Sequence, residues 1–220
     1  MVILKASGLE KAYGPLQVLR GIDLEIQKGE IVSIVGASGA GKSTLLQIMG
    51  TLDKADNGSL IINGNTISHL SEKNLALFRN KEVGFIFQFH NLLPEFTAFE
   101  NVCIPGYLGN KNAKDVEIRA KELLELLGLN SRINHKPGAL SGGEQQRTAV
   151  ARALINSPSI VFADEPSGNL DSKNAEDLHK LFFRLREEFS QTFVIVTHNE
   201  SLANGADRKL EMKDGRILIE

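Results

Sequence analysis

Short apolar runs and alternating stretches predict strands over much of the chain. Residues 31–35 and 160–163 are almost continuously apolar, a pattern typical of parallel strands that are buried on both faces. Residues 22–27 instead alternate between apolar and polar side chains, which favours an antiparallel strand with one exposed face. Residues 59–62 and 66–67 flank an Asn-Gly-Asn sequence, so we expect them to pair across a turn.

A helical periodicity replaces these strand patterns between about residues 91 and 155. Apolar side chains recur there at helix spacing, and Gly128 fits the end of a helix. These apolar positions are Ile118, Leu123, Leu124, Leu126 and Leu127. A second apolar stripe, which predicts the last long helix, consists of Leu178, Leu181, Phe182 and Leu185. Further strands are predicted at residues 83–87, 192–196, 208–212 and 216–219.

Composition narrows the class of protein. Of the 220 residues, 42% are hydrophobic and 24% are charged, which is ordinary for a globular chain that buries a sizeable core. The net charge of −2 does not favour a nucleic-acid surface, and we expect no nucleic-acid partner. The sequence has no run of about 18 apolar residues and no basic-then-apolar leader, so we expect a cytosolic chain. Cys103 is the only cysteine, which excludes an intrachain disulfide and favours a buried or idle thiol over a reactive one.

Residues 36–44 read GASGAGKST, which matches the Gly-x-x-x-x-Gly-Lys-Ser pattern of a phosphate-binding loop. Glycine at 36 and 41 lets the backbone curl until several N–H groups face inward, where a side chain would block the anion. We expect Lys42 to bring charge to the β- and γ-phosphates and Ser43 to offer its hydroxyl to Mg²⁺. A predicted strand precedes this cradle and a predicted helix follows it, as such a loop requires. The cradle consists of Gly36, Ala37, Ser38, Gly39, Ala40, Gly41, Lys42, Ser43 and Thr44.

Two adjacent acids, Asp164 and Glu165, follow the second buried strand. Open α/β sheets bind ligands at the carboxyl ends of their strands, where these acids are expected. Asp164 would hold Mg²⁺, directly or through water, and Glu165 would orient and deprotonate the attacking water. An acid pair at a solvated strand end is the ordinary alternative, and the cradle in the same chain favours the catalytic interpretation.

The predicted fold is α/β, with a P-loop NTPase core built on a mixed sheet, an antiparallel β-subdomain and an inserted α-helical subdomain. We predict one domain over residues 1–220. Residues 1–90 and 156–220 would form the core and the β-subdomain, and residues from about 91 to 155 would form the helical subdomain.

A second glycine pair lies in the sequence LSGGE at residues 140–144. Ser141, Gly142 and Gly143 are expected to open a helix that runs to about residue 155. Their hydroxyl and amide groups, together with the helix dipole, would form a second anion site. The structural alternative is a plain helix N-cap.

In this order, the motifs resemble those of the nucleotide-binding subunits of ATP-binding cassette (ABC) transporters, and the resemblance covers essentially the whole chain. LSGGE is the signature of that family. Tyr13 stands ahead of the cradle, Gln88 follows a predicted strand, residues 167–171 (SGNLD) follow the acid pair, and His198 follows a later strand. Taken singly, Tyr13 fits a half-buried aromatic residue, Gln88 a surface amide and His198 a loop histidine.

The resemblance implies ATP and Mg²⁺ as ligands and assigns a role to each motif. Tyr13 would stack on adenine. The implied catalytic residues are Lys42, Gln88, Glu165 and His198. The implied Mg²⁺ ligands are Ser43, Gln88 and Asp164. A head-to-tail homodimer would bring a second subunit's signature onto the γ-phosphate, through Ser141, Gly142, Gly143 and Glu144.

A finer resemblance concerns the transported cargo. Residues 87–102, 163–171 and 210–216 are similar to the subgroup that includes lipoprotein-releasing and macrolide-exporting systems, and most of all to lipoprotein-releasing ATPases. This implies a peripheral subunit on the cytoplasmic face of the bacterial inner membrane, bound to integral-membrane permease subunits. The link at residues 14–17 is shorter than in many members, which leaves the adenine loop and the exact substrate open.

The resemblance also implies where the permease docks. Apolar residues follow Gln88, where the family receives the cytoplasmic helix of its membrane partner, and core packing is their alternative role. These residues are Phe89, Leu92, Leu93, Phe96 and Phe99. A macrolide-type exporter, a cell-division ABC complex and a soluble ABC ATPase of the DNA-repair or translation type remain alternative functions. The last type usually carries long coiled coils or two cassettes in one chain.

Overall fold

A 6-stranded mixed sheet, with strand order β10-β9-β3-β8-β7-β6, forms the centre of the computed structural model, which describes residues 1–218. Its strands are β3 (Ile31–Val35), β6 (Val83–Ile86), β7 (Ile160–Asp164), β8 (Phe193–Val196), β9 (Arg208–Lys213) and β10 (Arg216–Leu218). All neighbouring strands from β9 to β6 are parallel, and only the edge strand β10 is antiparallel to its neighbour. The predicted mixed sheet is therefore confirmed. Residue 219, the predicted end of the last strand, lies outside the described residues.

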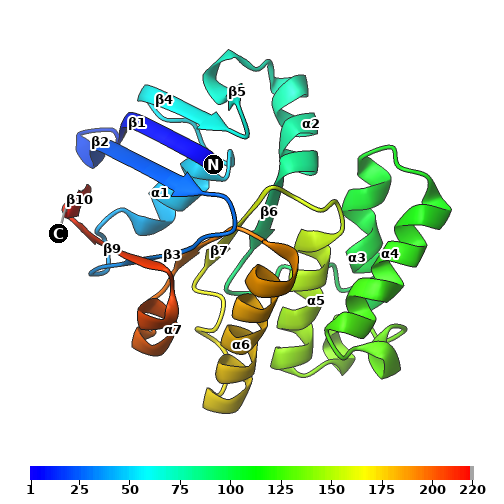
Figure 1. Cartoon of the computed structure of the whole chain (residues 1–220). Coiled ribbons are helices and arrows are strands. Elements are labelled where there is room, and N and C mark those ends of the chain that lie inside the picture. The colour runs from blue at the N-terminus through cyan, green and yellow to red at the C-terminus, as the bar shows by residue number, and fades with distance from the viewer. Residues whose placement is uncertain (219–220) are drawn as a thin grey trace.

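A 4-stranded antiparallel sheet with the order β2-β1-β4-β5 lies beside it (Figure 1). Its strands are β1 (Val2–Tyr13), β2 (Leu16–Gln27), β4 (Asn57–Ile62) and β5 (Asn65–Thr66). The turn between β4 and β5 contains only Asn63 and Gly64, whose φ angles of 45° and 75° fit a tight hairpin turn. The prediction that Ile67 belongs to the second strand was wrong, because that strand ends at Thr66 and Ile67 begins a 3₁₀ turn.

Helices pack against both faces of the central sheet. The helices are α1 (Lys42–Met49), α2 (Glu72–Glu82), α3 (Ala98–Leu108), α4 (Ala113–Leu126), α5 (Gly142–Leu154), α6 (Ser172–Phe189) and α7 (Glu200–Gly205). Alternate residues of β3 face different cores: Val32 and Ile34 pack with α1 and the antiparallel sheet, whereas Ile31 packs with the helices of the other face. Both faces of the parallel strands are thus buried, which explains their nearly continuous apolar sequences.

The segment predicted to be helical contains α3, α4 and α5, which lie together on one side of the molecule (Figure 1). We propose boundaries near residues 91 and 155 for this helical subdomain. Residues 91–97 are not helical, because α3 begins only after the N-cap Thr97. Ile118 lies on α4 as its spacing predicted, but on the exposed face: it is 58% exposed, and Val116 and Ala120 occupy the buried face.

Gly128 ends α4 as predicted. Its φ angle is 69°, and its N–H donates to the carbonyl oxygen of Glu125 at 2.9 Å. The N–H of Leu129 donates to the carbonyl oxygen of Leu124 at 2.7 Å, which completes a Schellman motif. The strand predictions at 83–87 and 192–196 were each one residue too long, because β6 ends at Ile86 and β8 begins at Phe193.

Candidate nucleotide-binding site

The cradle lies at the carboxyl ends of the parallel strands, between β3 and α1. It borders a pocket of about 620 Å³ that also receives Tyr13, Glu165 and His198. Gly36 has a φ angle of 146°, and a Cβ built there would lie 2.1 Å from the carbonyl oxygen of Met212 in β9. The protein's own backbone therefore already requires glycine at this position, and the further expectation that a side chain here would block the anion stays a prediction.

The first turn of α1 is suited to an anion. Gly41 caps this helix without a side-chain hydrogen bond, and no acidic residue occupies the first turn. The helix dipole and the free N–H groups there favour negative charge. The ammonium group of Lys42 donates to the carbonyl oxygens of Gly36 at 2.8 Å and Ala37 at 3.0 Å, which places its charge at the loop.

Ser43 and Asp164 bring two oxygen atoms together beside the cradle. The Ser43 hydroxyl donates to Asp164 Oδ1 at 3.1 Å. Burial raises the pKa of the Asp164 carboxyl, and the neighbouring charge of Glu165 raises it further, whereas the Ser43 hydrogen bond opposes them. Residues 1–218 contain no group of three or more His, Cys, Asp or Glu side chains placed to hold a metal. A hydroxyl and one carboxylate fit Mg²⁺, which usually takes its other ligands from phosphate and water.

Glu165 follows β7 and meets the residue that follows β8. Its Oε2 atom accepts a hydrogen bond from the backbone N–H of His198 at 3.2 Å and lies 2.9 Å from His198 Nδ1. The Glu165 side chain is 18% exposed, whereas that of His198 is 73% exposed. Glu165 has a φ angle of 45°, which is rare for a residue with a side chain. The structure therefore brings the predicted acid and histidine together in the pocket.

Tyr13, at the end of β1, lines the same pocket. Tyr13 is 49% exposed, which also matches the half-buried aromatic residue considered from the sequence. Its hydroxyl donates to Asp53 Oδ2 at 2.6 Å. Nothing in the sequence pattern had identified Asp53, which is 40 positions away along the chain.

Gln88 is placed differently from the other predicted catalytic residues. Its amide Nε2 lies 3.5 Å from Asn169 Oδ1, and Asn169 Nδ2 donates to the carbonyl oxygen of Gln88 at 3.3 Å. This pair joins the segment after β6 to the segment after β7. The proposed roles of Gln88 in catalysis and Mg²⁺ binding remain predictions.

The LSGGE segment forms the start of α5. Ser141 Oγ accepts from the N–H of Glu144 at 3.3 Å, and Glu144 Oε2 accepts from the N–H of Ser141 at 2.8 Å, which is a capping box. The Ser141 backbone and the Arg132 guanidinium hold the pKa of the Glu144 carboxyl at about 2. Sequence reasoning missed Arg132, because no motif or periodicity marks it.

The signature and the cradle are separate in the subunit. Within residues 1–218, no side-chain hydrogen bond or ion pair joins Ser141 or Glu144 to the cradle, and the signature does not line the nucleotide pocket. The two predicted anion sites therefore do not combine within one chain.

The ABC transporter family matches residues 19–168 of this chain. The chain belongs to the ABC transporter family. It is 62% identical to the lipoprotein-releasing system ATP-binding protein LolD of Cytophaga hutchinsonii, over 98% of this chain and 99% of that protein. It is 60% identical to LolD of Bacteroides thetaiotaomicron, over 98% and 99% of the two chains. The dimeric post-hydrolysis structure of the ATP-binding cassette MJ0796, bound to ADP and Pi, matches with 40% identity and a TM-score of 0.90. That match covers 98% of this chain and 97% of MJ0796.

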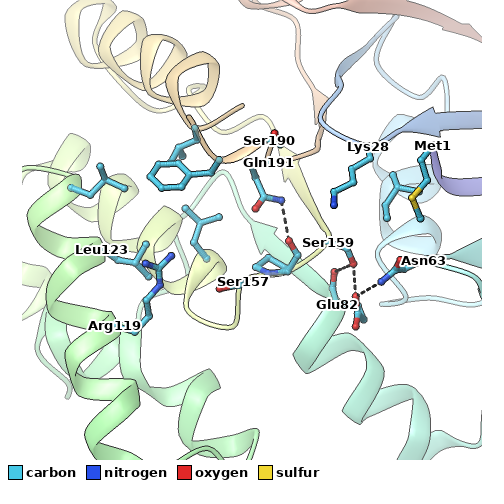
Figure 2. Close-up of a pocket in the computed structure, with 16 residues that line it drawn as sticks. Met1, Lys28, Asn63, Glu82, Arg119, Leu123, Ser157, Ser159, Ser190 and Gln191 are labelled. Carbon is cyan, nitrogen blue, oxygen red and sulfur yellow. Dashed lines mark hydrogen bonds between the residues drawn. The ribbon is translucent and has the colours of Figure 1, made fainter. Parts of the chain in front are cut away.

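A second cavity of about 440 Å³ in this ABC ATPase lies at the amino-terminal ends of the parallel strands, opposite the cradle. Lys28, Glu82, Ser159 and Gln191 each precede a parallel strand and line this cavity (Figure 2). Glu82 Oε2 accepts hydrogen bonds from Asn63 Nδ2 and Ser159 Oγ, so hydrogen-bond donors of the protein itself satisfy this carboxylate oxygen. Residues of the cradle line the pocket at the carboxyl ends of the strands, and none of them lines this second cavity. Residues 1–218 include no helix with the length and apolar character to cross a bilayer.

Proposed function

We propose that this ABC ATPase is the ATP-hydrolysing subunit of a bacterial transporter that releases lipoproteins from the inner membrane toward the outer membrane. The catalytic part rests on one observation: the cradle, Asp164, Glu165 and His198 lie together at the carboxyl ends of the parallel strands. The lipoprotein part is supported by the relatives named LolD, which match over nearly their whole length. The subunit would act at the cytoplasmic face of the inner membrane, bound to permease subunits.

Each element of the site has a task in this proposal. The α1 amides and Lys42 bind the phosphates, and Tyr13 stacks on the adenine base. Ser43, Asp164 and Gln88 would hold Mg²⁺. When bound, this ion would supply neutralising charge to the β- and γ-phosphate oxygens.

Glu165 is the residue that we propose to orient water and accept its proton. The backbone N–H of His198 holds the carboxylate, and the His198 side chain is exposed enough to meet the γ-phosphate. Proton acceptance by a positioned carboxylate contributes typically about 10²- to 10⁴-fold to a rate.

The separation of the two anion sites favours a composite site between two copies. The LSGGE segment of one subunit would close on the γ-phosphate that the cradle of the other holds. ATP would then join the subunits, and its hydrolysis would release them. The dimeric MJ0796 cassettes support this arrangement.

We propose the segment after Gln88 as the permease contact. Phe89, Leu93 and Phe96 are 72%, 43% and 40% exposed, which is unusual for large apolar side chains placed close together in sequence. Phe99 packs against the helical core instead, so core packing accounts for part of the predicted cluster.

Glu165→Gln tests the catalytic part. We expect the variant to bind ATP, to hydrolyse it about 10²-fold more slowly or worse, and to form a stable dimer with Mg-ATP. Phosphate release and light scattering with and without Mg-ATP measure both effects. Normal hydrolysis by the variant would refute the assignment of Glu165.

The cargo needs a separate measurement. The complex with its permease, reconstituted in vesicles that carry a lipoprotein, should release that lipoprotein when ATP is supplied. The Glu165→Gln complex is the matched control. Active hydrolysis without release would exclude lipoprotein as the cargo and leave the ATPase assignment intact.

A further inference from the structure

Tyr13 is held by a group of residues that lie outside the cradle. It is the last residue of β1 and pairs with Leu16 across a turn of only two residues. Its hydroxyl donates to Asp53 Oδ2 at 2.6 Å. Asp53 lies in the loop that follows α1, so this bond connects the antiparallel sheet to the end of the cradle's own helix.

Lys11 completes the group. It is only 8% exposed, and its ammonium group lies 3.2 Å from Asp53 Oδ1 and 5.2 Å from the centre of the Tyr13 ring. It also donates to the carbonyl oxygen of Lys54 at 2.6 Å. A buried ammonium group needs such partners, because its desolvation is otherwise costly. Lys11 therefore fixes Asp53 and contacts the Tyr13 ring at the same time.

The arrangement limits the freedom of the ring at both ends. The short turn fixes the backbone of Tyr13, and Asp53 fixes its hydroxyl. A half-exposed aromatic side chain that is free to rotate loses rotamer entropy when a ligand orders it, whereas a ring that is already ordered does not. The Asp53 contact thus reduces the cost of stacking a base on Tyr13.

We propose that Asp53 and Lys11 are positioning residues that hold the Tyr13 ring in place for the adenine base. This inference rests on the proposed nucleotide site. Neither residue lines the pocket beside Glu165 or the cradle. Loss of Asp53 should therefore raise the KM for ATP and leave kcat nearly unchanged.

The chain allows a direct spectroscopic test, because it contains two tyrosines and no tryptophan. Tyr107 lies on α3 and is not part of the pocket, so Tyr107→Phe leaves Tyr13 as the only tyrosine. The Asp53 hydrogen bond raises the pKa of the Tyr13 phenol. In the Tyr107→Phe background, without nucleotide, Asp53→Ala should shift the ultraviolet titration of Tyr13 to lower pH. An unchanged titration would overturn the contact itself.

Steady-state kinetics test the consequence for ATP. Asp53→Ala and Tyr13→Phe each remove the same hydrogen bond, so each should raise the KM about 3- to 10-fold. The double variant should be no worse than either single variant. Asp53→Asn keeps an acceptor for the hydroxyl and should recover part of the affinity. Glu25→Ala is a matched control, since it breaks the exposed pair with Lys5 in the same sheet and should leave the KM unchanged.

Tyr13→Leu separates this inference from the nucleotide assignment. If Tyr13→Leu leaves the KM unchanged, base stacking on Tyr13 fails, and the positioning role fails with it. If Tyr13→Leu raises the KM while Asp53→Ala and Tyr13→Phe do not, the nucleotide site stands and only the positioning role is refuted. If Asp53→Ala raises the KM and lowers kcat by similar factors and also lowers the melting temperature, the role of Asp53 is purely structural. That result would also overturn the positioning role.

Discussion

Replacing Glu144 by glutamine removes one charge from the start of α5 while preserving the shape of the side chain. Glu144 accepts from the Ser141 N–H at 2.8 Å and from Arg132 Nε at 2.9 Å. Both contacts favour the ionised carboxylate, and they hold its pKa at about 2 against an ordinary value of 4.5. The variant therefore tests whether this charge stabilises the signature helix.

The expected loss follows from the pKa. The difference between 4.5 and about 2, at about 1.4 kcal/mol per pKa unit, gives an upper limit of about 3.5 kcal/mol. Glu144 is 19% exposed and Arg132 is 44% exposed, so water screens part of this interaction. We expect Glu144→Gln to lower the free energy of unfolding by about 1 to 2 kcal/mol at pH 7.

Urea unfolding at two pH values measures the effect. The folded-state pKa is depressed, so the contribution of the carboxylate is fully present above about 4.5 and is lost as the pH falls toward 2. The difference between wild type and Glu144→Gln should consequently be smaller at pH 3.5 than at pH 7. Glu176→Gln breaks the exposed pair with Lys180 and should leave the unfolding midpoint unchanged. A loss below about 0.3 kcal/mol at pH 7, or an equal loss at both pH values, would refute the electrostatic reasoning.

Four further predictions concern other residues of the structure. Lys42→Ala should weaken ATP binding by titration calorimetry as well as hydrolysis, and unchanged affinity would contradict its role at the phosphates. Ser141→Arg should leave ATP binding by single subunits intact and abolish the ATP-dependent dimer in sizing experiments; loss of binding itself would argue against a trans contact. Phe96→Ser should keep the melting temperature and lose co-purification with the permease, whereas unfolding would identify Phe96 as a core residue. Burial lowers the pKa of His179 in the folded protein, so as the pH falls this histidine takes up a proton in the unfolded chain before it does so in the folded one. The free energy of unfolding should therefore decrease as the pH drops below about 6.5, by at most about 1.4 kcal/mol per pH unit. His179→Leu should flatten that slope in urea titrations.

Local patterns were sufficient to predict the strands that lead into the cradle and into the acid pair. Residues 31–35 and 160–164 form strands that are buried on both faces, and this burial requires the continuous apolar sequence from which they were predicted. Gly128 was predictable for a similar reason, because the end of α4 needs a positive φ angle that glycine adopts without strain. In both cases the cause acts within a few residues of the pattern.

The contacts that position the site residues act over longer separations and were not predictable. Asp53 meets Tyr13 from 40 positions away, and Arg132 meets Glu144 from 12 positions away. An aspartate in a loop and an arginine in a short 3₁₀ turn have no distinguishing periodicity, so only the folded chain selects them. Ile118 shows a related limit, because an isolated apolar residue at roughly helical spacing does not reveal which face of the helix is buried.

Glu165 shows how the fold supports a conformation that its own residue disfavours. A φ angle of 45° costs a residue with a side chain about 1 to 2 kcal/mol. Two backbone hydrogen bonds hold it there: its N–H donates to Val196 at 2.9 Å, and its carbonyl oxygen accepts from Gly168 at 3.0 Å. Because β7 and β8 are buried in the middle of the sheet, neither strand can move to relieve the strain. Glycine would remove that cost and also remove the carboxylate, so a glutamate in this conformation is explained by the chemistry that we propose for it and not by stability.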